Sequence, residues 1–361
     1  MIYSVSGEQL NSAYDKNGNA LQSVYGVDGG EYTFGVPTVT PLTWDMPDDY
    51  KNQILDTLDE IETYQNEHEG SYSICQFNDV HLGFSGNEPN FIDYNGGYNI
   101  ISRMLFVGDM VDMYTSDPIQ YTNAIAYMSG AQASKRIVCI GNHEYGSSYN
   151  PADGNPEILY NALNDKISAH YMRDDVIIFY SDNNVNNVRY IILNPFYITQ
   201  KKDEHDHLLD DAQISWCASA MESAGDRDII IVCHTVMNPF ELLATQEEVT
   251  SSPLQGQDKL VNLITAYKNR WTYSISVNNV THNYDFSRCT GDFIMYTSGH
   301  YHIAGYFNKN GFNMITCPAR IVRTAGLIRG ITFYIIDPTL KKIKMIICSL
   351  DDDRSTYEFT Y

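Results

Sequence analysis

The sequence predicts an α/β fold in which strand-rich layers are covered by helices. Short apolar runs of strand length recur between residues 71 and 348, and stretches with amphipathic helical spacing lie between several of them. Elements that alternate in this way form sheets with helices packed on their faces. With 361 residues, the chain is long enough for one large core and a small appendage.

Hydrophobic patterns locate the individual elements. Helical spacing is clear after residue 48, where Ile54, Leu58 and Ile61 recur among charged residues. The expected helices are 48–67, 118–128, 157–167, 212–221 and 259–267. The expected strands are 71–77, 104–107, 137–140, 176–180, 188–193, 229–233, 293–297, 331–336 and 343–348. The order of the strands in a sheet does not follow from these patterns.

The beginning of the chain differs from the rest in composition. Residues 1–45 are rich in Gly, Asn, Ser and Tyr and end in the proline-containing segment 36–41. Such a composition is typical of turns and extended connectors. We therefore expect an N-terminal extension of turns or short hairpins at 1–45 and a principal domain at 46–361.

Charge and composition exclude several classes of partner. The formal net charge is −22, and the sequence lacks the Lys and Arg clusters on which nucleic-acid binding depends. No apolar run approaches the roughly 20 residues of a bilayer span, and the amino terminus lacks the features of a secretion signal. We expect a cytoplasmic protein that binds neither nucleic acid nor membrane. The seven cysteines are interpreted as reduced core residues, since several lie in apolar runs.

Chemistry-bearing residues gather in five short motifs, each placed directly after an apolar run. The ends of strands in α/β sheets are where such folds build their sites. The motifs are Asn78-Asp79-Val80-His81, Gly108-Asp109-Met110-Val111-Asp112, Gly141-Asn142-His143-Glu144, Cys233-His234-Thr235 and Gly299-His300-Tyr301-His302. A single Gly-Asp or strand-end His is more typical of a turn or a core, but all five in this order favour a functional site.

The side chains in these motifs are suited to metal ions. Because side chains in an extended strand alternate with period two, Asp79 and His81 are expected to point to the same side. The same holds for His300 and His302. Carboxylate, amide and imidazole ligands without thiolate suit divalent manganese, iron, cobalt or zinc.

The ordered set of motifs resembles the signature of the calcineurin-like metallophosphoesterases. The resemblance covers residues 71–304, and the later strands 331–336 and 343–348 fit the second sheet of that family. It implies a four-layer αββα sandwich with two mixed β-sheets flanked by helices. Asn78 departs from the small Ser or Thr that the family commonly has at this position.

The resemblance also implies two metal sites and a role for each motif. The first ion would be held by Asp79, His81, Asp109 and His302, and the second by Asp109, Asn142, His234 and His300. Asp109 would bridge the two ions. His143 would lie beside the metals and interact with the substrate, and Asp112 would orient the ligand shell or His143.

This arrangement predicts hydrolysis of a phosphomonoester or phosphodiester by a metal-bridging hydroxide. Two divalent ions would bring a charge of +4 against −2 from Asp79 and Asp109, so the site would attract phosphate although the protein is acidic. His143 would act as general acid, because histidine titrates near neutral pH. Purely electrostatic support of the phosphate is the alternative for His143. The expected substrate is a small phosphorylated molecule or a nucleotide.

Other readings stay open at this point. One is a non-catalytic, metal-containing binding or assembly module, for instance in a phage particle, with residues 1–45 as its docking segment. The run 203–207, Asp-Glu-His-Asp-His, is interpreted as a solvated loop rather than as a further metal site. Tyr145, Tyr301 and Arg320 are interpreted as packing or surface residues rather than as pocket residues.

Overall fold

The computed structural model divides the chain into two compact units, Met1–Asp45 and Met46–Tyr361. It describes residues 46–81, 88–111, 118–145, 159, 169–173, 176–196, 207–249, 254–307, 311–320, 329–351 and 353–361. In the first unit it describes two antiparallel strand pairs. They are β1 (Ile2–Tyr3) with β2 (Gln9–Leu10), and β3 (Ser23–Tyr25) with β4 (Glu31–Thr33).

The larger unit is built on a six-stranded and a nine-stranded sheet. The six-stranded sheet has the order β21 (Ser355–Thr360), β20 (Lys342–Ser349), β19 (Gly330–Asp337), β5 (Tyr72–Phe77), β6 (Ile101–Val107) and β7 (Arg136–Cys139). The nine-stranded sheet has the order β13 (Glu248–Val249), β12 (Phe240–Leu242), β17 (Gly305–Phe307), β18 (Asn313–Thr316), β16 (Phe293–Ser298), β11 (Asp228–Cys233), β10 (Val188–Leu193), β9 (Val176–Asn183) and β8 (Ala169–Arg173). Both sheets are mixed. In the nine-stranded sheet the parallel strands lie in the middle, between antiparallel strands. In the six-stranded sheet β5, β6 and β7 are parallel at one edge, and β19, β20 and β21 are antiparallel at the other.

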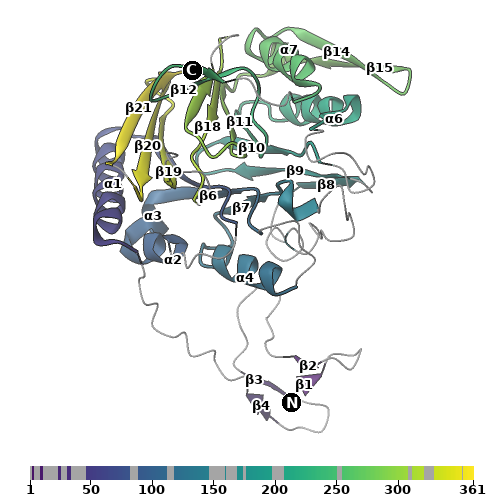
Figure 1. Cartoon of the computed structure of the whole chain (residues 1–361). Coiled ribbons are helices and arrows are strands. Elements are labelled where there is room, and N and C mark those ends of the chain that lie inside the picture. The colour runs from purple at the N-terminus through teal and green to yellow at the C-terminus, as the bar shows by residue number, and fades with distance from the viewer. Residues whose placement is uncertain are drawn as a thin grey trace. The chain divides into compact units, whose positions relative to one another are not determined.

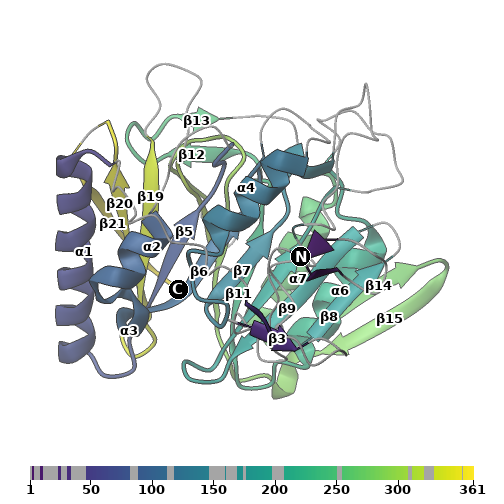
Figure 2. The same ribbon diagram turned by 90° about the horizontal axis from the view of Figure 1, so that it is seen from below.

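Helices cover the outer faces of both sheets (Figure 1 and Figure 2). On the six-stranded sheet, α1 (Asp48–Glu67) packs on β20, and Tyr127 of α4 (Pro118–Met128) packs on Phe77 and Phe106. On the nine-stranded sheet, α6 (Asp211–Glu222) contacts β10 and α7 (Gln257–Lys268) contacts β16. A short helical segment comprises α2 (Glu88–Ile92), η1 (Asp93–Gly97) and α3 (Tyr98–Ile100).

The inner faces of the two sheets meet in the core. The hydroxyls of Thr297 in β16 and Tyr334 in β19 lie 3.1 Å apart, and the thiol of Cys139 in β7 donates to the carbonyl of Leu193 in β10. Strands β5, β10, β16 and β19 are therefore buried along their whole length, because one face meets a helix and the other meets the opposite sheet. This explains why their sequences are continuous apolar runs. The predicted four-layer αββα sandwich is confirmed.

Most predicted elements agree with the structure to within one to three residues. Helix 157–167 lies outside the described residues apart from Leu159, which is helical and buried. The strands that the apolar runs did not predict are β8, β12, β13, β17, β18, β21 and the hairpin of β14 (Thr272–Val277) and β15 (Val280–Asp285). The hairpin is largely exposed, so its polar sequence carries no apolar run.

The seven cysteines all belong to the described residues, and all are buried free thiols, as predicted. Burial raises the pKa of several of them, including Cys75 and Cys139, so these thiols stay protonated at neutral pH. None of the helices that the structure describes combines the length and the apolar character that a bilayer span needs.

Candidate metal centre

All five motifs meet at one place, where strands of both sheets end. Asp79 and His81 follow β5, Asp109 follows β6, and the segment 141–144 follows β7 in the six-stranded sheet. His234 follows β11, and His300 and His302 follow β16 in the nine-stranded sheet. Backbone bonds join the loops, such as His81 N–H to the Asp109 carbonyl at 2.9 Å. Each sheet therefore contributes part of the cluster.

The backbone at the cluster differs from the predicted extended strand ends. Asp79 and His81 are not at an extended strand end, because their φ angles are +50° and +44°. Asp109, His300 and His302 also have left-handed φ angles, of +50°, +73° and +61°. Non-glycine residues in this conformation cost about 1–2 kcal/mol each. Tight turns, rather than strand alternation, bring these side chains together, and such strain is typical of functional sites.

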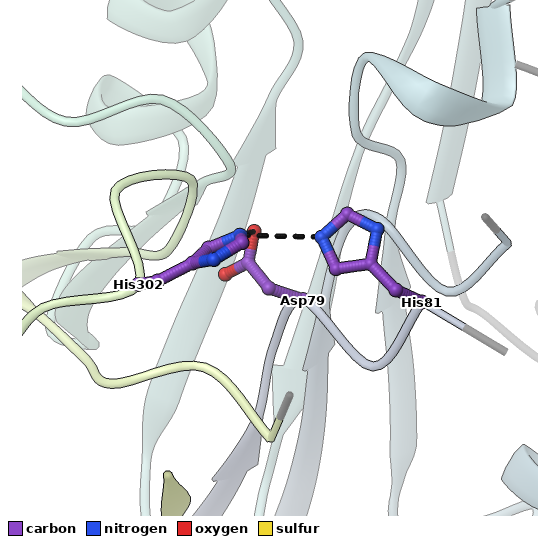
Figure 3. Close-up of side chains that lie close together, drawn as sticks. All are labelled: Asp79, His81 and His302. Atoms are coloured by element: carbon purple, nitrogen blue, oxygen red, sulfur yellow. Dashed lines mark hydrogen bonds and ion pairs between the residues drawn. The ribbon is translucent and has the colours of Figure 1, made fainter. Parts of the chain in front are cut away.

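The first group of potential ligands comprises Asp79, His81 and His302, whose ligand atoms all lie within 4.8 Å of one another. The Nε2 atoms of His81 and His302 face each other at 3.2 Å. Asp79 Oδ1 lies 3.3 Å from His302 Nε2. Figure 3 shows the Asp79 carboxylate beside the His302 ring, with the His81 ring opposite.

The second group comprises Asp109, His234 and His300. His300 Nδ1 lies 3.3 Å from His234 Nε2, and Asn142 Oδ1 lies 3.1 Å from each of these nitrogens. His234 Nδ1 lies 2.8 Å from the carbonyl of Val107, which can only accept a hydrogen bond. Nδ1 therefore carries the proton, and Nε2 is the atom that faces the cluster.

Asp109 lies between the two groups. Its Oδ2 is 3.2 Å from His234 Nε2 and 4.0 Å from His81 Nε2, while its Oδ1 accepts a hydrogen bond of 2.9 Å from the backbone of His143. One carboxylate oxygen is thus anchored, and the other faces ligand nitrogens of both groups. This is the position that a bridging ligand requires.

The donor set fits a pair of divalent ions. Two imidazole nitrogens that bind one ion at about 2.1 Å lie about 3.0–3.4 Å apart, and the His81–His302 and His234–His300 distances of 3.2 and 3.3 Å fall in this range. Facing nitrogens at this distance also need either a proton or a cation between them. Oxygen and nitrogen ligands without thiolate suit borderline metals such as manganese, iron, cobalt or zinc.

The electrostatics of the cluster also favour cations. Burial by itself raises the pKa of Asp79, but the imidazoles of His302 and His234 outweigh it and lower this pKa to about 2. Burial by itself lowers the pKa of His234, but the carboxylates of Asp109 and Asp79 outweigh it and raise that pKa to about 10. Two buried carboxylates therefore hold a positive charge between them, and bound ions would supply that charge.

The structure describes His143 but not Asp112. His143 Nε2 lies 3.7 Å from Asp109 Oδ2, and its ring lies 4.5 Å from the His81 ring. His81, Asp109 and His143 form a third group with ligand geometry, so both a metal-binding and a substrate-binding position are open to His143. Asp112 lies outside the described residues, and its orienting role stays a prediction.

Glu144, in the third motif, has a structural role that the sequence analysis did not assign. Its carboxylate is fully buried and accepts four backbone hydrogen bonds. Oε1 accepts from Met110 and Val111 at 2.7 and 3.1 Å, and Oε2 accepts from Gly141 and Asp109 at 2.7 and 3.1 Å. Glu144 thereby joins the loop that carries Asp109 to the loop that carries Asn142 and His143.

Replacing Glu144 by glutamine is expected to lower the free energy of unfolding by about 2–4 kcal/mol. The amide NH₂ would face backbone N–H groups, so two buried donors would lose a charged acceptor. Chemical denaturation of the metal-free protein measures this loss. Glu222→Gln is the control, because the exposed carboxylate of Glu222 accepts one backbone bond from the described residues, that of Asp285, and its change is expected to stay below about 0.5 kcal/mol. Equal effects of the two substitutions would contradict the assignment.

The glycines of the motifs allow side chains to approach the backbone closely. A Cβ atom at Gly108 would lie 2.3 Å from His234 Nδ1, and one at Gly141 would lie 2.3 Å from Asp109 Oδ1. Gly108 also has a φ angle of +75°. These positions therefore require glycine because ligand side chains pack directly on them.

One interpretation from the sequence analysis is wrong. His207, the last residue of the run 203–207, is not part of a solvated loop but is fully buried. Its ring lies 4.7 Å from the ring of His300 in an edge-to-face arrangement. The neighbouring charged residues 203–206, which lie outside the described residues, concealed this position in the sequence. The apolar Leu208-Leu209 that follows was the available signal.

Of the three residues interpreted as packing or surface residues, the structure describes the side chains of Arg320 and Tyr301. Arg320 is buried and pairs with Glu88, and Tyr301 packs on Phe240 with ring centroids 5.8 Å apart. Packing roles therefore account for both. The side chain of Tyr145 lies outside the described residues.

Comparison with solved structures shows the fold. A dimetal phosphatase from Danio rerio is similar with a TM-score of 0.50 and 11% identity over 80% of this chain and 99% of that chain. The GAP50 anchor of the Plasmodium inner membrane complex is similar with a TM-score of 0.44 and 10% identity over 80% and 89% of the two chains. No family model and no curated protein sequence matches. The chain therefore has a phosphoesterase-like fold, and at this identity the likeness extends to the fold alone.

Proposed function

We propose that this protein is a metal-dependent phosphoesterase that hydrolyses a phosphomonoester or phosphodiester. The observation that carries the proposal is the position of Asp109 Oδ2 between two groups of ligand atoms, 3.2 Å from His234 Nε2 and 4.0 Å from His81 Nε2. Support also comes from the fold, which is similar to that of a dimetal phosphatase.

The residues of the cluster would form two metal sites that share Asp109. Asp79, His81, Asp109 and His302 would hold one ion, and Asp109, Asn142, His234 and His300 would hold the other. When bound, two divalent ions would bind the phosphate, lower the pKa of a water so that hydroxide attacks phosphorus, and stabilise the charge that develops in the transition state. Manganese, iron, zinc and cobalt all suit these ligands.

His143 would protonate the leaving oxygen. Its side chain is 14% exposed, so Nε2 lies at the border between the buried cluster and solvent. The backbone N–H of His143 donates to Asp109 Oδ1, which ties the position of this residue to that of the bridging carboxylate. A substrate bound at the cluster would meet the imidazole without a large rearrangement.

The metal content and the activity of the purified protein test this proposal. We expect close to two transition-metal ions per chain by elemental analysis, and hydrolysis of an aryl phosphate or a bis-aryl phosphate. Removal of the ions with a chelator is expected to abolish hydrolysis, and addition of manganese, iron, zinc or cobalt is expected to restore it.

The outcome also separates the two classes of function. Absence of hydrolysis with every metal, across monoesters, diesters, cyclic nucleotides, dinucleotides and phospholipid head groups, would contradict the enzyme and favour the metal-containing assembly module. Activity on one of these classes would define the leaving group, about which the ligand atoms carry no information.

A further inference from the structure

Asn78 is a buried amide that connects the two sheets beside the candidate centre. It follows β5 of the six-stranded sheet and is 1% exposed. Its Nδ2 donates to the carbonyls of Pro318 and Cys317, at 2.9 and 3.2 Å, in the segment that follows β18 of the nine-stranded sheet. The backbone N–H of Arg320 donates back to the Asn78 carbonyl at 3.0 Å. The position of Asn78 is thus fixed from both sheets.

The same amide nitrogen donates to the carboxylate of Asp79, with 2.8 Å to Oδ2. Three oxygens surround Nδ2, and all of them can only accept. On the other side of the amide, Gln76 Nε2 lies 3.4 Å from Asn78 Oδ1. This environment fixes the orientation of the amide group, because a flipped amide would place an oxygen against three acceptors.

The two oxygens of Asp79 therefore have different surroundings. Oδ2 accepts from Asn78 Nδ2 at 2.8 Å and from the backbone N–H of His300 at 3.0 Å, and the same N–H lies 3.2 Å from Oδ1. Oδ1 lies 3.3 Å from His302 Nε2 and 3.9 Å from His234 Nε2. Oδ2 thus has two N–H donors, whereas Oδ1 shares the N–H of His300 and otherwise faces the imidazoles.

We propose that Asn78 is a positioning residue that anchors Asp79 Oδ2, so that Asp79 binds the ion held by His81 and His302 through Oδ1 alone. The proposal rests on the proposed function, because it requires an ion at that group. A carboxylate that is held by donors on one oxygen has lost its freedom to rotate, and loss of such an outer partner typically weakens metal binding about 10–100-fold.

Two substitutions of Asn78 remove the donor in different ways. Asn78→Asp keeps the shape but places a carboxylate oxygen against Asp79 Oδ2 and two carbonyls, whereas Asn78→Ser removes the amide without adding charge. We expect both variants to raise the dissociation constant of one of the two ions about 10–100-fold. The constant of the other ion is expected to change by less than about threefold, since Asn142, His234 and Asp109 keep their partners.

The measurement is a titration of the metal-free full-length chain with Mn²⁺, with the bound metal read by elemental analysis and electron paramagnetic resonance. Wild type is expected to show the spin-coupled signal of a manganese pair at two equivalents. The variants are expected to show an uncoupled, mononuclear signal at the same free metal concentration. This selective loss of one ion distinguishes positioning from a general structural role, which would weaken both ions or neither.

Asn313→Asp is the matched control. Asn313 is also a fully buried amide, donates to the Thr360 carbonyl at 2.9 Å, and lies at the end of β18 remote from Cys317. It is expected to leave both constants unchanged. If folded Asn78→Ser binds both ions as tightly as wild type, the inference is overturned. If Asn78→Asp does not fold, the result for Asn78→Ser alone tests the inference. Failure of wild type to bind manganese, iron, zinc or cobalt overturns the proposed function as well.

Discussion

Replacing Asp109 by alanine is expected to lower kcat for phosphate ester hydrolysis by at least about 10³-fold, a loss of at least about 4 kcal/mol of transition-state stabilisation. Asp109 Oδ2 faces nitrogen ligands of both groups, so its removal is expected to affect both ions at once. It would also leave the buried imidazole of His234 without its principal counter-charge. Steady-state kinetics and elemental analysis of the same preparation measure the two effects together.

Asp337→Ala provides the control for Asp109→Ala. Asp337 is a buried carboxylate with partners of its own, Tyr64 and His68, and it lies at the end of β19 remote from the centre. Its replacement is expected to reduce stability while kcat and metal content of the folded protein stay within about twofold. An Asp109→Ala protein that keeps two ions and a kcat within tenfold of wild type would rule out a bridging role.

Replacing His143 by glutamine is expected to lower kcat/KM for an alkyl phosphate about 10²–10⁴-fold, but to lower it less than about tenfold for a nitrophenyl phosphate. An alkoxide must be protonated as it leaves, whereas nitrophenolate leaves without a proton. The measurement is kcat/KM for a series of leaving groups, together with the pH–rate profile of each. The slope of log(kcat/KM) against leaving-group pKa is expected to become steeper in the variant.

The result of the His143 series also decides between its two roles. An equal loss for both substrates would indicate electrostatic support of the phosphate instead of proton donation. Loss of one bound ion from His143→Gln would show that the group His81, Asp109 and His143 binds metal. His282→Gln, in the exposed strand β15, is the control and is expected to leave all rates unchanged.

The sequence predicted the layers of the fold because the buried strands are recognisable in it. Strands such as β5, β10 and β19 are covered on both faces, and this requires continuous apolar runs. The exposed hairpin β14–β15 and the short strands β12, β13 and β17 are stabilised by neighbours rather than by their own pattern, so no local signal predicted them.

The sequence predicted which residues form the candidate site, but not the turns that orient them or the residues that support them. The order of the motifs predicted which side chains would meet. The prediction that strand alternation orients Asp79 and His81 was wrong, because left-handed turns orient them. The roles of Asn78 and Glu144 depend on partners such as Pro318 and Met110, and pairings of this kind are set by tertiary structure. The burial of His207 had a local signal in Leu208-Leu209, but its contact with the ring of His300 is made across the fold and has none.

The division of the ligands between two sheets sets the order of events when the protein is made. His81 and His302, whose Nε2 atoms face each other, are separated by 221 positions along the chain. The chain must therefore be synthesised beyond His302 before either of the proposed ions can reach its complete set of ligands. Cofactor loading would then be a late step that reports correct assembly, and half-finished chains would be unable to sequester scarce transition metals from the cell.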